Sequence, residues 1–72
     1  MSLNTRKIRK VADFIGVSVE RVLICLGEDP YPYYLARSNL ASTPQEARKA
    51  YYDAPSGSEA ERVAVRKTYD MI

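Results

Sequence analysis

The side chains that most often carry out chemistry in proteins are scarce in this sequence. It contains no histidine and one cysteine, Cys25, which lies in the apolar run VLICL. A Ser-His-Asp or Cys-His nucleophile therefore cannot be assembled from this chain alone, and the usual proton shuttle is missing. A zinc site built on cysteine and histidine and an intramolecular disulfide are excluded for the same reason. We expect Cys25 to be a small core residue, since Ile24 and Leu26 offer no charge that would activate its thiol.

The carboxylates predict helix capping and surface positions, not acid–base catalysis. The nine Asp and Glu residues show no paired arrangement beyond these roles. Glu46 stands three residues after Thr43, which is the spacing of a capping box. Ser56 and Glu59 repeat this spacing, with Ser58 and Glu61 as an alternative register. We therefore expect no catalytic residue, no metal site and no cofactor, and we interpret the chain as a non-catalytic protein.

Length and composition place the chain among small globular proteins. Its 72 residues make at most one domain, residues 1–72, or a piece of a longer protein. A domain of this size buries only roughly 60% of its unfolded surface, so its core is marginal. No run approaches the ~18 apolar residues of a membrane span, and no signal-peptide core follows the charged N-terminus. We expect a cytoplasmic protein that makes no membrane contact.

The first part of the chain predicts two short helices. Asn4 or Thr5 can cap a helix that ends at about Ile15, and Gly16 suits the left-handed residue that follows. A second helix is expected over about residues 19–26. The apolar positions of the first helix recur at helical spacing and are Ile8, Val11, Ala12 and Ile15.

Small and apolar residues set the expected angle between these two helices. They are Val11, Ala12, Ile15, Gly16, Val17, Val22 and Cys25. Through them, residues 8–27 resemble a helix-turn-helix pair, which implies that the second helix would read base edges in the major groove. The matching outward positions hold Ser18, Val19, Glu20, Leu23, Ile24 and Gly27. Only Ser18 suits that task and Glu20 would repel phosphate, so the residues disfavour DNA reading.

A second pattern covers the same segment and ends in an apolar helix closed by Leu-Gly. It is carried by Val11, Ala12, Ile15, Gly16, Val17, Ser18, Val22, Leu23, Leu26 and Gly27. In this pattern the segment is similar to the small helical module at the N-terminus of bacterial translation initiation factor two. The match does not extend beyond Asp29. The resemblance implies a packing or docking module and transfers no binding residues.

The second part of the chain predicts a connector followed by helices. Residues 28–34 form the connector, and a short helix is expected over about residues 33–41. Thr43 and Ser58 can cap two further helices that end near residues 54 and 71, joined closely enough to form an antiparallel hairpin. No stretch alternates as a strand does. We predict an all-α fold, a small bundle of four to five short helices, with a helix-turn-helix-like N-terminal pair and a C-terminal helical hairpin.

The second predicted helix, VERVLICL, is apolar on almost every side. In one interpretation the C-terminal helices cover Val19, Leu23 and Ile24, making it the central helix of the bundle. In the other, part of this face stays exposed and binds a partner protein or a second copy of the chain. A further candidate interface is the tyrosine cluster of the connector, Tyr31, Tyr33 and Tyr34. These tyrosines could instead pack over the open end of the bundle.

Positive charge is concentrated in the first predicted helix. Residues 1–10 hold four cations and no acid, whereas residues 11–30 carry a net charge of −3. The cations are candidates for contact with phosphate or nucleic acid and are Arg6, Lys7, Arg9 and Lys10. The alternative is a solvated helix face. The leading hypothesis is a non-catalytic protein–protein interaction module that binds a partner or forms a homo-oligomer; the alternative is a nucleic-acid-binding protein with a helix-turn-helix-like scaffold.

Overall fold

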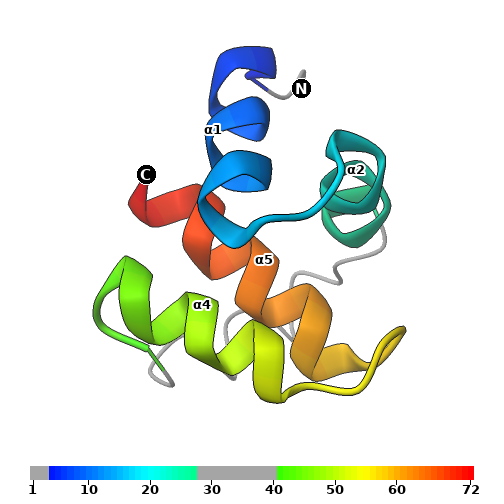
Figure 1. The fold of residues 1–72 in the computed structure, drawn as a ribbon, viewed down its shortest axis with the longest axis vertical. Helices are drawn as coiled ribbons and strands as arrows, with labels where there is room; N and C mark the ends of the chain where they lie inside the picture. The colour runs from blue at the N-terminus through cyan, green and yellow to red at the C-terminus, as the bar shows by residue number, and fades with distance from the viewer. Residues whose placement is uncertain (1–3, 28–40) are drawn as a thin grey trace.

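A computed structural model of the chain describes residues 4–27 and 41–72. These residues form four α-helices and no strand: α1 (Thr5–Ile15), α2 (Val19–Gly27), α4 (Pro44–Asp53) and α5 (Glu59–Met71). Helix α5 runs through the middle of the molecule, with α1 and α2 on one side and α4 on the other (Figure 1). The predicted all-α bundle is confirmed. Except for Ala41, the helix predicted over residues 33–41 lies outside the described residues.

The turn between α1 and α2 forms as its residues predict. The side chain of Asn4 accepts a hydrogen bond from the N–H of Lys7 at 3.1 Å and so caps α1. Gly16 ends the helix with a φ of 88°, and its N–H donates to the carbonyl of Ala12 at 2.8 Å. The hydroxyl of Ser18 then accepts from the N–H of Arg21 at 3.1 Å, which starts α2.

The core lies where α1, α2 and α5 meet. Its buried members are Ile8, Val11, Ala12, Ile15, Val22, Cys25, Leu26 and Val65. Cys25 is 1% exposed and is a core residue, as predicted. The buried positions on α2 fall on one side of the helix, the side that contacts α1 and α5, so its opposite side points away from the core.

The α4–α5 pair is the predicted hairpin. The hydroxyl of Thr43 accepts from the N–H of Glu46 at 3.2 Å, and that of Ser58 accepts from the N–H of Glu61 at 3.2 Å. Both capping residues therefore act as expected. Small residues line the contact between the helices and allow their backbones to approach; the buried ones are Ala47, Val63 and Ala64.

Two tyrosine hydroxyls hold α1 at its ends. The hydroxyl of Tyr69, on α5, accepts from the N–H of Asn4 at 3.1 Å. At the other end, the hydroxyl of Tyr52, on α4, donates to the carbonyl of Ile15. Since the last carbonyls of a helix have no partner within it, this bond supplies one and ties α1 to α4.

Replacing Gly16 by Ala tests the turn. A Cβ at this position would lie 3.3 Å from the hydroxyl of Tyr52 and would sit on a left-handed residue. We expect a loss of about 1–2 kcal/mol from the backbone conformation, and a further loss because Tyr52 must move. The measurement is urea-induced unfolding followed by circular dichroism.

Gly57→Ala is the matched control. Gly57 also has a positive φ, of 80°, but a Cβ there would have nothing within 4 Å. The Gly57→Ala variant should therefore lose unfolding free energy through the backbone conformation alone, because no neighbour has to move. Equal losses of unfolding free energy in the two variants would contradict a role for Tyr52 in the turn.

Candidate functional site

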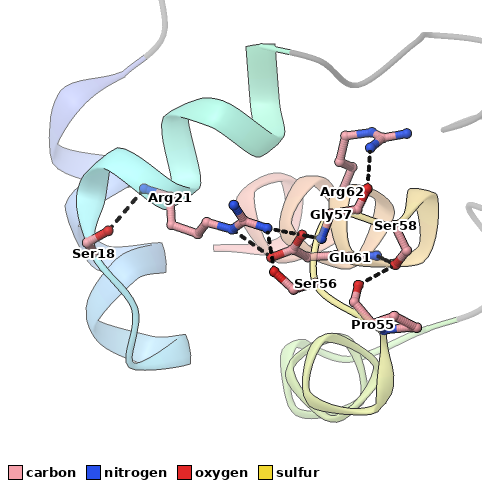
Figure 2. Close-up of polar contacts among 8 residues, drawn as sticks. All are labelled: Ser18, Arg21, Pro55, Ser56, Gly57, Ser58, Glu61 and Arg62. Carbon is pink, nitrogen blue, oxygen red and sulfur yellow. Dashed lines mark hydrogen bonds and ion pairs between the residues drawn. The ribbon is translucent and has the colours of Figure 1, made fainter.

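The most connected polar group in the described residues is an ion pair between α2 and α5, in which Glu61 is buried and Arg21 is partly exposed. The Nε of Arg21 donates to Oε2 of Glu61 at 2.8 Å, and its Nη2 donates to Oε1 at 2.5 Å. The same Nη2 also donates to the hydroxyl of Ser56 at 3.1 Å. Figure 2 shows the guanidinium reaching from α2 to the turn that precedes α5. We call this group the Arg21–Glu61 clamp.

Both carboxylate oxygens of Glu61 accept hydrogen bonds. Glu61 is 3% exposed and also accepts from the N–H of Gly57 at 2.7 Å. Burial alone would raise the pKa of the Glu61 carboxyl, but the hydrogen bonds from Arg21 and Gly57 and the charge of Arg21 bring that pKa below its ordinary value. The hydrogen bond to Glu61 in turn raises the pKa of Arg21. These shifts favour the charged, paired state, in which the clamp joins α2 to α5.

Sequence reasoning missed this clamp. It treated Glu61 only as a capping residue and assigned no role to Arg21. The partners are separated by 40 positions, so no local pattern joins them. The available signal was that Arg21 is the only cation of α2, because a lone cation on a helix that packs closely needs a partner.

The outward side of α2 is an exposed apolar surface. Leu23 is 43% exposed and Ile24 is 49% exposed. Glu20, one turn earlier on the same side of the helix, is exposed as well. We call these three residues the α2 outer surface. The interpretation in which the C-terminal helices cover Leu23 and Ile24 is therefore wrong.

Val19 requires the opposite correction. It was placed with Leu23 and Ile24 on one candidate interface, but it is partly buried and packs against the core. The reason is its position on the first turn of α2, next to Val22 and Leu26 on the inward side. The interpretation in which the rest of the bundle covers these residues is thus correct for Val19 and wrong for Leu23 and Ile24.

The four cations of α1 fall into two settings. Arg6, Arg9 and Lys10 are exposed, whereas Lys7 is partly buried with its Nζ 4.7 Å from the centre of the Tyr69 ring. Within residues 4–27 and 41–72 none of the four forms an ion pair. An open hollow of about 280 Å³ lies beside three of them; its lining is Asn4, Arg6, Lys7, Lys10 and Ile72. Arg9 lies outside this hollow.

The remaining features of the described residues include one further hollow and no group of metal ligands. An apolar hollow of about 50 Å³ between α4 and α5 is lined mainly by alanines, and is too small for an organic ligand. In the described part of the chain, no three potential metal ligands gather, and no helix is both long and apolar enough to span a membrane. Tyr31, Tyr33 and Tyr34 lie outside the described residues.

Comparisons with protein-family models, curated proteins and solved structures found no match to the chain.

The dependence of stability on pH below neutrality tests the Arg21–Glu61 clamp. The pKa of Glu61 is lowered in the folded protein, so its charge adds stability above the unfolded value, about 4.3, and that stability is lost as pH falls through the folded value. Glu61→Gln should lower the unfolding midpoint at neutral pH. The difference from the unaltered chain should narrow in acid. Thermal unfolding at a series of pH values measures both.

Glu46→Gln is the matched control. Glu46 stands at the same capping position and accepts from the N–H of Ser42 at 2.9 Å, as Glu61 does from Gly57. Hydrogen bonds from the hydroxyl and N–H of Ser42 lower the pKa of Glu46 too, but no cation in residues 4–27 or 41–72 forms an ion pair with it. Its variant should lose clearly less stability at neutral pH. Equal losses would mean that Arg21 adds nothing.

Proposed function

We propose that this chain is a non-catalytic helical module that binds another protein through the α2 outer surface. The observation that carries the proposal is the exposure of Leu23 and Ile24 side by side on one helix. A domain this small has a marginal core and would gain stability by burying them. Adjacent apolar side chains left in water on such a domain are typical of an interaction site.

The charges around this surface favour a protein over a nucleic acid. Glu20 borders the apolar pair, and the only cation of α2, Arg21, is held by Glu61. A helix that contacts DNA needs cations for the phosphates and polar groups for base edges, whereas this surface holds no cation and one polar side chain, the acidic Glu20. The partner that fits has an apolar hollow for Leu23 and Ile24 and a basic side chain near Glu20.

Helix α2 is well placed for such binding because it is fixed before the partner arrives. Val22, Cys25 and Leu26 anchor its inward side, and the Arg21–Glu61 clamp anchors its flank. A partner that receives one face of a preformed helix does not have to order it, which lowers the cost of association. We take the module to act in the cytoplasm, as its composition predicts.

Leu23→Glu and Ile24→Glu test the proposal. Both side chains are about half exposed, so each change should alter the unfolding free energy by only about 0.5 kcal/mol. A photoreactive residue at position 24 of the full chain, introduced in the cells that make the protein, should attach covalently to a protein partner. Leu23→Glu should then weaken binding of that partner by at least about tenfold, the range of a central interface residue.

Gln45→Glu supplies the control, because Gln45 is exposed on α4 and the change adds the same charge. It should leave binding unchanged, and a photoreactive residue at position 45 should give no adduct. An adduct with a second copy of the chain, together with concentration-dependent sedimentation abolished by Leu23→Glu, supports the proposal with the chain as its own partner. Attachment to nucleic acid, or no adduct at position 24, would overturn it.

A further inference from the structure

We propose that the hollow at the start of α1 is a second binding site, independent of the α2 outer surface, and that it receives phosphate groups of a nucleic-acid backbone. The cations that line this α1 hollow are Arg6, Lys7 and Lys10, with Asn4 and Ile72 completing its wall. The site is defined by these side chains and by their concave arrangement.

No carboxylate side chain among the described residues forms an ion pair with the cations of the α1 hollow. Helices α2, α4 and α5 each carry glutamate in their first turn, whereas α1 carries none. Arg6 and Lys10, one turn apart, repel each other, and a cation is also unfavourable at the start of a helix. Asp13, the one acid of α1, forms no ion pair in the described residues. An external anion would relieve these unfavourable interactions.

The shape of the hollow suits a small anionic group. Its volume of about 280 Å³ lies just below the range of pockets that enclose organic ligands. Part of its wall is held in place. The ammonium group of Lys7 lies over the ring of Tyr69, and the hydroxyl of Tyr69 accepts from the N–H of Asn4.

A polymer of phosphates fits better than one free phosphate. The side chains of Arg6 and Lys10 are exposed, and single exposed ion pairs in salt water contribute little. A nucleic-acid backbone offers phosphates at regular spacing and releases bound counterions when cations replace them, which adds to affinity. The one neutral polar side chain of the hollow, Asn4, is engaged in capping α1, so binding is expected to be independent of sequence.

Fluorescence anisotropy of a labelled DNA duplex, titrated with the full chain at several NaCl concentrations, tests the proposal. Three cations on three phosphates predict a slope of log K against log salt of about −2.7. Arg6→Ala should reduce its magnitude by about 0.9 and weaken binding about eightfold at about 0.1 M salt. A labelled RNA strand in the same titration shows whether the site accepts either backbone.

Arg9→Ala is the matched control. Arg9 is on the same helix, is also exposed and carries the same charge, but lies outside the α1 hollow. It should leave slope and affinity nearly unchanged, and circular dichroism should show both variants folded. Equal losses in the two variants would mean diffuse attraction and would overturn the site. Failure to bind either nucleic acid would also overturn it, as would equal occupancy by inorganic phosphate alone or binding only to anionic lipid vesicles.

Discussion

The orientation of α2 depends on the pairing of the partly exposed Arg21 with the buried Glu61. This pair joins the flank of α2 to the first turn of α5, and Ser56 and Gly57 bring the intervening turn into the same network. Such a pair is costly to break because one partner would remain as an uncompensated charge. A rotation of α2 that buried Leu23 and Ile24 would have to break it. The clamp therefore keeps the apolar surface of α2 facing outward.

The two candidate surfaces differ in chemistry and belong to different helices. The α2 outer surface is apolar with an acidic border, and the α1 hollow is basic and polar. Helix α1 is held by Tyr69 at its start and by Tyr52 at its end, so its position does not depend on the clamp alone. This separation allows one small domain to present two unlike surfaces, since neither shares side chains with the other.

Local features of this fold could be predicted from sequence because their causes are local. Asn4, Gly16, Thr43 and Ser58 cap or end helices through bonds to residues a few positions away, and all four do so. The inward stripe of α1 was predictable for the same reason. What could not be predicted was the rotation of α2, because almost every side of that helix is apolar and periodicity does not select one. The deciding contact, to Glu61, comes from 40 residues away.

The central claim is that the described fold leaves Leu23 and Ile24 in water while it buries their neighbours. Methyl-resolved NMR of the folded chain with a soluble paramagnetic agent measures this directly. The account predicts strong relaxation of the Leu23 and Ile24 methyl groups and protection of those of Val22 and Val65, both 0% exposed. Protection of Leu23 and Ile24 equal to that of Val22 would contradict it.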